Sequence, residues 1–416
     1  MKSAPRGRIA AVVGVIASAG LVLAACGGST SGGSSSAPAE SSAPAESSAP
    51  AESSAPAESS APAESSPAAG ACTEIMPVSL QLQWFVQAQF GGYYAAKDLG
   101  YYEEQCLDVA ILEGGVDIVP QTQLAQGAAD YAIAWVPKAL ASREQGAGIV
   151  DVAQVYQRSG TLQVSWADSG IKTPADLKGK KVGNWGFGNE FELFAGLTQA
   201  GLKPGKDVEL VQQQFDMQAL LNREIDAAQA MTYNEYAQVL EAVNPDTGEL
   251  YKPEDFSVIN WNDVGTAMYQ DAIWASEERL SDPMYQDMTQ RFVTASLKGW
   301  IYCRDNPQEC ADIITANGSK LGASHQLWMM NEVNKLIWPS PLGVGIIDPA
   351  LWTQTVGVAL NTLNADEVTI ITADPGEAAY TNQYAEAANA ALTAEGLNTT
   401  GDAFAPISVE LKEGGA

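Results

Sequence analysis

Short stretches of alternating apolar and polar residues are separated by stretches of helical periodicity from residue 78 to about residue 256. Val78, Leu80, Leu82 and Trp84 share one face of an extended segment, which predicts a strand over residues 78–84. Further strands are predicted over residues 108–112, 131–135, 151–157, 161–167, 181–185, 208–214 and 227–231. Helices are predicted between them, over residues 90–105 with a turn at Gly100, 119–127, from Pro137 onward, 174–177, 189–200, 217–224 and 233–243.

After about Phe256 the periodicity is mainly helical, and it is strongest over residues 283–303, 307–316, 324–336 and 378–394. The strand–helix alternation before that point predicts parallel sheets with helices on both faces. Residues 72–416 number about 345, which is long for one core and normal for two domains. We therefore expect an α/β protein with two domains.

The first 25 residues have the pattern of a bacterial secretory signal. Lys2, Arg6 and Arg8 precede an apolar run over residues 9–25, which is too short and too rich in Ala and Gly to favour a membrane span. The run ends in Leu-Ala-Ala-Cys, which matches a lipobox whose Cys26 receives diacylglycerol. We expect a lipoprotein signal peptide over residues 1–25 and a lipid anchor at Cys26 on the extracytoplasmic face of the cell membrane. An ordinary signal peptide with a chance Cys is the alternative.

Residues 26–71 have the composition of a linker. From Gly27 to Gly70 there is no aromatic residue and no Leu, Ile or Val, and Ser-Ser-Ala-Pro-Ala-Glu recurs with a period of six. Such a segment cannot bury enough apolar surface to offset the entropy of ordering, so a disordered tether is expected. Regular Pro and Glu favour an extended chain that reaches on the order of 100 Å.

The charge balance excludes one class of partner. The chain has a net charge of −28; five acidic residues lie in the tether and three basic residues in the signal, so residues 72–416 carry −26. Such a surface repels nucleic acid and anionic lipid, so no nucleic-acid partner is expected.

Four cysteines remain once Cys26 is taken by lipid, an even number that suits disulfides in an oxidising compartment. They are Cys72, Cys106, Cys303 and Cys310. Three pairings are possible, and we favour Cys303 with Cys310 and Cys72 with Cys106. A metal site is not expected, because no C-x-x-C unit is present and His325 is the single histidine.

The loops that follow the predicted strands are rich in aromatic and amide side chains. In parallel sheets, ligands bind at the carboxyl ends of the strands. Flat aromatic faces suit a planar heteroaromatic ligand, while amides and a carboxylate can bind its ring nitrogens and exocyclic amine. The candidate ligand-binding residues are Trp84, Gln87, Gln89, Phe90, Trp135, Tyr156, Trp185, Phe187, Asn189, Glu190, Tyr233, Asn234 and Glu235. Packing in the core is the competing interpretation for any one of these aromatic residues.

Several candidates have a second interpretation. Gly186-Phe187-Gly188-Asn189 lacks the lysine of a phosphate loop, so its glycines are expected to let backbone amides approach a ligand. A carboxylate at Glu190 or Glu235 in a first helical turn either caps a helix or contacts ligand. His325 lies in a helical pattern without a Ser or Cys nucleophile motif nearby, so no catalytic residue is expected.

Three segments carry a family resemblance: LQLQWFVQAQFGGYYAAKDLGYYEEQCLDVAILEGG, IKTPADLKGKKVGNWGFGNEFE and AAQAMTYNEY. They resemble the solute-binding proteins of ABC importers, in the group of sulfonate, nitrate and taurine binders and thiamine-pyrimidine-synthase-like proteins. The resemblance covers nearly all of residues 77–395. It implies the periplasmic-binding-protein type II fold: two lobes, each with a mostly parallel sheet flanked by helices, joined by a hinge and closing on ligand. The implied divisions are residues 72–162 (first part of lobe 1), 163–256 (lobe 2) and 257–416 (completion of lobe 1 and C-terminal helices).

The resemblance also implies a function. A monomeric binding protein would capture a small molecule without a cofactor and deliver it to an ABC permease. The aromatic loop after residue 84 and the Tyr-Asn-Glu loop at Tyr233 look more like binders of thiamine pyrimidine precursors, or next of riboflavin-like rings, than of oxyanions. A sulfonate, nitrate or taurine binder is the first alternative. A pyrimidine-synthase-like enzyme is the second, although its Cys-rich iron-linked motif and His/Lys pair are not found in this sequence, and a receptor that keeps only the fold is the third.

Overall fold

The computed structural model describes residues 72, 74–115 and 117–416. The expected signal peptide, the lipid anchor at Cys26 and the tether lie outside these described residues. Within the described part of the chain, no helix is both long and apolar enough to cross a membrane.

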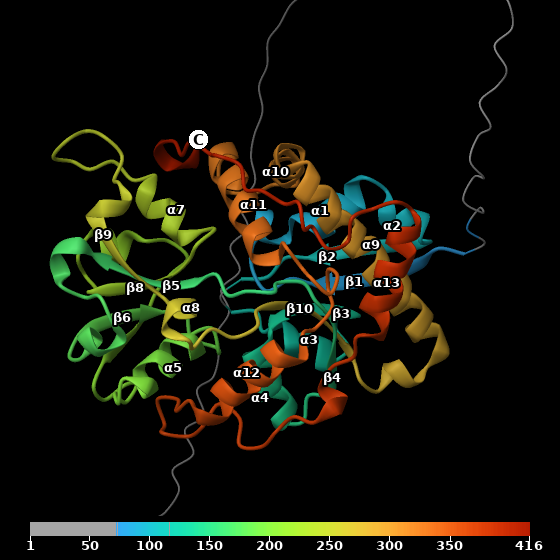
Figure 1. The fold of residues 1–416 in the computed structure, drawn as a ribbon, viewed down its shortest axis with the longest axis horizontal. Coiled ribbons are helices and arrows are strands. Elements are labelled where there is room, and N and C mark those ends of the chain that lie inside the picture. The colour runs from blue at the N-terminus through green and yellow to red at the C-terminus, as the bar shows by residue number, and fades with distance from the viewer. Residues whose placement is uncertain (1–71, 73, 116) are drawn as a thin grey trace, which may run out of the picture. The chain divides into compact units, whose positions relative to one another are not determined.

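The first of two five-stranded sheets has the order β2-β1-β3-β10-β4 (Figure 1). Its strands are β1 (Met76–Gln81), β2 (Leu107–Leu112), β3 (Tyr131–Trp135), β4 (Ile149–Gln154) and β10 (Asp271–Ser276). β1 is parallel to both β2 and β3, with Val78 opposite Val109, whereas β10 is antiparallel to β3 and β4. Four strands therefore run in one direction and β10 runs against them.

The second sheet repeats this arrangement in the order β7-β6-β8-β5-β9. Its strands are β5 (Thr161–Trp166), β6 (Lys181–Asn184), β7 (Glu209–Gln212), β8 (Ala227–Met231) and β9 (Phe256–Asn260). β6 is parallel to β7 and β8, while β5 is antiparallel to β8 and β9 and is here the reversed strand. The expectation of two lobes with mostly parallel sheets is confirmed.

Two segments of chain connect the lobes. The chain leaves the first sheet after Gln154 and enters the second at Thr161, and it returns between β9 and β10. The two crossings are hydrogen-bonded to each other, since the Gly160 amide donates to Gln270 Oε1 at 2.8 Å and the Tyr156 amide donates to the Asp271 carbonyl at 3.0 Å. A paired two-segment connection of this kind is suited to act as a hinge.

Helices flank both sheets (Figure 1). They are α1 (Gly91–Asp98), α2 (Tyr101–Glu104), α3 (Pro120–Ala125), α4 (Val136–Glu144), α5 (Phe191–Gln199), α6 (Gln218–Leu221), α7 (Glu235–Leu240), α8 (Trp261–Val264), α9 (Pro283–Asp305), α10 (Pro307–Ala316), α11 (Ala323–Ile337), α12 (Pro349–Asn361) and α13 (Gln383–Ala394). The largest core cluster lies in the first lobe, where α9 contributes the fully buried Phe292 and Trp300. α1 packs directly on α9, because a Cβ at Gly92 would lie 2.3 Å from the Trp300 ring.

The sequence prediction was wrong in the C-terminal half at three places. β9 and β10 form where mainly helical structure was expected, and α12 was not predicted. β10 is buried along its length except at Ser276, so it lacks the polar alternation that marks a half-buried strand. The predicted helix over residues 174–177 is a single 3-10 turn.

Two disulfides join the four cysteines in the favoured pairing. Cys72 is bonded to Cys106, which ties the start of the described chain to the residue before β2, and Cys303 in α9 is bonded to Cys310 in α10. The second bond spans the break between these helices at Pro307.

Candidate functional site

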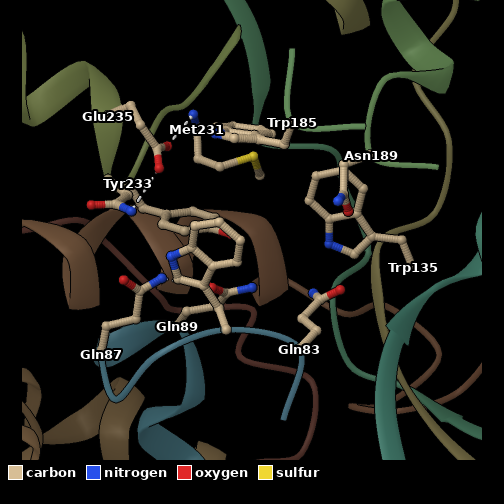
Figure 2. A pocket seen from close by; sticks show the side chains of 11 residues that line it. Gln83, Gln87, Gln89, Trp135, Trp185, Asn189, Met231, Tyr233 and Glu235 are labelled. Carbon is tan, nitrogen blue, oxygen red and sulfur yellow. Dashed lines mark hydrogen bonds between the residues drawn. The ribbon is translucent and has the colours of Figure 1, made fainter. Parts of the chain in front are cut away.

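A cavity lies between the lobes, at the carboxyl ends of the parallel strands β1 and β3 of the first sheet and β6 and β8 of the second. About 360 Å³ of it is free of protein atoms when the part open to solvent is counted. Its walls are Gln83, Trp84, Gln87, Gln89, Trp135, Trp185, Asn189, Met231, Tyr233, Asn234 and Glu235. Figure 2 shows the three glutamines of the first lobe on one side, with Trp185, Tyr233 and Glu235 of the second lobe across from them. Cavities at the carboxyl ends of parallel strands are typical small-molecule sites.

Asp271 holds the first-lobe side of the cavity in place. Its Oδ1 accepts hydrogen bonds from Gln83 Nε2 at 2.9 Å and from Gln89 Nε2 at 3.0 Å, and its Oδ2 accepts one from Trp135 Nε1 at 2.7 Å. Gln87 joins the same network by donating to Gln89 Oε1 at 2.7 Å. One buried carboxylate at the start of β10 therefore sets the orientation of three side chains on the wall.

Burial raises the pKa of Asp271 to about 6, although hydrogen bonds from Gln89, Trp135 and Gln83 and the nearby charge of Lys138 lower it. The carboxyl group is therefore mainly ionised at neutral pH. Its negative charge lies next to the amides of Gln83 and Gln89, and Gln83 Oε1 is left without a hydrogen-bond partner.

The loop after β6 supplies Trp185 and Asn189 from the second lobe. Gly186 and Gly188 have φ values of +75° and +88°, and Phe187 between them has +55°, so the chain makes a tight left-handed turn. Gln229 on β8 anchors both ends of this loop, because its Oε1 accepts from the Trp185 amide and its Nε2 donates to the Asn189 carbonyl.

The loop after β8 supplies Tyr233, Asn234 and Glu235. The Glu235 carboxyl accepts hydrogen bonds from the Met231 amide at 2.9 Å and from Asn234 Nδ2 at 2.8 Å. Burial raises its pKa to about 7 in spite of these bonds. Glu235 is therefore partly protonated near neutral pH, when it can donate as well as accept a hydrogen bond.

Aromatic rings face the cavity from both lobes. The Trp84 and Trp185 ring centroids are 6.4 Å apart at an interplanar angle of 61°, so the two rings meet edge to face across the lobes. Two buried polar atoms on the wall have no hydrogen-bond partner: the donor Trp185 Nε1 and the acceptor Gln83 Oε1. Unpaired buried groups are costly, so these two atoms could bond to polar atoms of a ligand in the cavity.

Nine of the thirteen candidate residues line this cavity, and four do not. Phe90 is fully buried in the first-lobe core. Tyr156 lies behind the wall, where its hydroxyl donates to the Gln89 carbonyl at 2.9 Å. Phe187 is 55% exposed. Glu190 accepts from the Gly188 amide at 3.0 Å, within the loop before α5, and its side chain makes no capping bond to that helix.

The sequence interpretation missed Gln83, Met231 and Asp271. Gln83 directly precedes the candidate Trp84, and Met231 lies two residues before the candidate Tyr233, so a search of whole strand-end loops would have found both. Asp271 begins a strand that was not predicted. His325 is not on the cavity wall; its ring nitrogens contact Glu241 at 2.9 Å and Asn234 at 3.1 Å, which joins α11 to α7.

Comparisons with known proteins agree with this fold. Residues 87–310 match the family described as "NMT1/THI5 like". The formylaminopyrimidine-binding protein of Halalkalibacterium halodurans is 25% identical over 241 residues, which cover 58% of this chain and 70% of that protein. The riboflavin-binding protein RibY of Chloroflexus aurantiacus is 25% identical over 304 residues, covering 70% and 82%.

A solved structure from Bordetella bronchiseptica RB50 has the same fold, with a TM-score of 0.58 and 17% identity over 76% of this chain and 98% of that one. At that identity the likeness concerns the fold alone. The family match spans more than half of the chain and includes the cavity residues Trp135, Trp185 and Glu235. The chain belongs to the NMT1/THI5-like family.

Proposed function

We propose that this protein is a solute-binding protein that captures a small planar heteroaromatic ligand between its lobes. A thiamine pyrimidine precursor is the first candidate and a riboflavin-like ring is the second. The observation that carries the proposal is the wall of the cavity, where tryptophans from both lobes, amides and one carboxyl group converge on a space between two hinged lobes. Related proteins named for binding a formylaminopyrimidine and riboflavin support the choice of ring.

The polar groups suit an aminopyrimidine. A ring of this class presents a nitrogen acceptor beside an exocyclic amine donor. A protonated Glu235 can donate to the ring nitrogen and accept from the amine, which gives two parallel hydrogen bonds. Trp185 Nε1 and Gln83 Oε1 offer one further donor and one further acceptor. Tyr233 and the tryptophans supply flat apolar faces for stacking.

The cavity fits the oxyanion alternative poorly. None of its wall residues is Lys or Arg, and Glu235 would repel a sulfonate or nitrate. The enzyme alternative also lacks support at the cavity, because the single histidine bonds Glu241 and Asn234 instead of facing the space. We therefore propose a binding protein and no catalytic step.

Delivery to an ABC permease and lipid anchoring complete the proposal. Cys26 would hold the protein at the extracytoplasmic face of the membrane, and residues 26–71 would tether the two lobes to that anchor. A tether keeps the local concentration of the loaded binding protein high near its permease, so tight docking between the two is not required.

The test is a titration of the purified protein with 4-amino-2,5-dimethylpyrimidine, followed by tryptophan fluorescence. We expect saturable quenching, and we expect Trp185→Ala to weaken binding by about 1 kcal/mol or more because a stacking face is lost. Phe187→Ala is the matched control, since Phe187 belongs to the same loop but is not on the wall of this cavity. Equal affinity for the wild type and Trp185→Ala would assign Trp185 to packing alone.

A further inference from the structure

A second, smaller cavity, here called the side cavity, adjoins the first, with about 320 Å³ free of protein atoms when the part open to solvent is counted. The two cavities share four wall residues, which are Gln83, Trp84, Trp185 and Asn189. The second cavity adds Gln121 from α3, Lys138 from α4 and Phe187 from the loop after β6. A ligand whose ring fills the first cavity can therefore extend a substituent into the second.

Lys138 is the cation of this side cavity. It is only 6% exposed, its Nζ donates to Asn189 Oδ1 at 3.1 Å, and it lies 5.6 Å from the centre of the Trp135 ring. Among the described residues, no carboxylate forms an ion pair with it at 4.0 Å or less. An ammonium group carries three N–H donors, so two remain available beyond the bond to Asn189.

Two acceptors accompany this donor. The Oε1 atoms of Gln83 and Gln121 are buried and have no hydrogen-bond partner. Gln83 has a fixed orientation, because its Nε2 is bonded to Asp271, so its oxygen is the unpaired end of the amide. A buried glutamine oxygen without a partner calls for a donor, and both of these residues are on the wall of the side cavity.

We propose that the side cavity binds a hydroxyl-bearing substituent, or arm, of the ring ligand. Lys138 is the residue that selects this substituent. This inference rests on the proposed function of the main cavity. A hydroxyl oxygen accepts from Lys138 Nζ while its hydrogen is donated to the Oε1 of Gln83 or Gln121. The main cavity binds the ring itself in the same way whether or not it carries a hydroxyl group. Lys138 therefore discriminates between the hydroxylated ring and the bare ring.

Other arms meet these groups less well. A carboxylate arm, or a phosphate arm in its dianionic form, accepts from Lys138 but has no proton for the glutamine oxygens. It also brings negative charge towards Asp271 and Glu190, whose charges act on Lys138. An apolar arm leaves two N–H groups of the lysine and both glutamine oxygens without partners. The ligand class is therefore a planar ring with a hydroxymethyl or longer hydroxylated substituent.

Two pyrimidines that differ only in this arm provide the test. Calorimetry would compare 4-amino-5-hydroxymethyl-2-methylpyrimidine with 4-amino-2,5-dimethylpyrimidine on the wild type, Lys138→Met and Gln121→Leu. We expect the wild type to bind the hydroxymethyl compound about tenfold more tightly, as expected for gaining hydrogen bonds to unpaired buried groups. Lys138→Met should lose most of this preference, which is measured as the ratio of its affinities for the two compounds because loss of the bond to Asn189 acts on both of them alike. Gln121→Leu should reduce the preference in the same direction.

Each outcome decides between the two proposals. Equal wild-type affinity for both compounds overturns the arm site and leaves the ring site standing. A preference that survives in both variants also overturns the role of Lys138. If neither compound binds the wild type, the proposed function fails and the arm site fails with it. If Lys138→Met does not give a cooperative unfolding transition, Gln121→Leu decides alone.

Discussion

Asp271→Asn should change ligand affinity more than it changes the free energy of unfolding, because Asp271 orients side chains on the cavity wall. The carboxylate accepts from Gln83, Gln89 and Trp135 at 2.9, 3.0 and 2.7 Å. An asparagine keeps one oxygen. If that oxygen faces the two glutamines, the new NH₂ group faces the Trp135 N–H, and one hydrogen bond is replaced by a contact between two donors.

Two opposing effects set the magnitude. A hydrogen bond to a charged acceptor contributes about 1.5–3 kcal/mol, which the variant loses at Trp135. Burial raises the pKa of Asp271 from 3.8 to about 6, so keeping it ionised in the folded state costs about 3 kcal/mol, and the variant removes that cost. The free energy of unfolding at pH 7 should therefore change by only about 1 kcal/mol.

Ligand affinity should respond more strongly than stability. Gln83, Gln89 and Trp135 are all on the cavity wall, and the substitution disturbs the group that orients them. Loss of one oriented contact corresponds to about 1.4 kcal/mol, or a tenfold weaker dissociation constant. Urea unfolding and a fluorescence titration with 4-amino-2,5-dimethylpyrimidine would measure the two quantities on the same preparation.

Asp151→Asn is the matched control. Asp151 is a fully buried carboxyl group on the neighbouring strand β4; its Oδ1 accepts from the Ala153 amide at 3.1 Å and its Oδ2 has no partner. It is not on the cavity wall, so its replacement should leave affinity unchanged. Wild-type affinity in Asp271→Asn, or an equal loss in both variants, would refute the role given to Asp271.

Two further predictions concern the second lobe. Gly188→Ala should weaken binding by more than tenfold, because its φ of +88° strains an alanine by about 1–2 kcal/mol and the new Cβ would lie 2.6 Å from Lys138 Cβ on the other lobe. The control Gly170→Ala, with a φ of +75° and nothing within 4 Å of the new Cβ, should keep full affinity in the same titration. Equal losses of affinity in the two variants would show that the clash with Lys138 is not the cause. Affinity for the dimethyl compound should fall as pH rises through about 7, since the neutral Glu235 that donates a hydrogen bond is present below its pKa and lost above it. Glu235→Gln should remove this pH dependence of affinity, measured by calorimetry from pH 6 to 8. The same pH dependence in the wild type and in Glu235→Gln would contradict the role of Glu235.

Much of the cavity could be predicted because strand ends are local features of the sequence. The strands ending near Trp135, Trp185 and Met231 follow from short apolar runs, and parallel strands bring their carboxyl ends to one edge of a sheet. The direction of an individual side chain could not be predicted in the same way. Phe90 and Tyr156 have the residue types of a ring-binding wall but point into the packed interior.

The hydrogen bonds that hold the cavity wall in place join distant parts of the chain. Asp271 meets Gln83 and Gln89 across separations of 188 and 182 residues, and it begins a strand with no alternating pattern. Lys138 has the sequence context of an ordinary helical lysine. Its proximity to Asn189 arises only when the second lobe meets the first.

The central claim is that the cavity between the lobes binds a planar nitrogen heterocycle. Its most direct measurement is a titration of the purified protein with 4-amino-5-hydroxymethyl-2-methylpyrimidine, with taurine and nitrate titrated in parallel. Three tryptophans line the cavity, so we predict saturable quenching of tryptophan fluorescence by the pyrimidine and no response to either anion. Saturable binding of taurine or nitrate, without any response to the pyrimidine, would contradict the account.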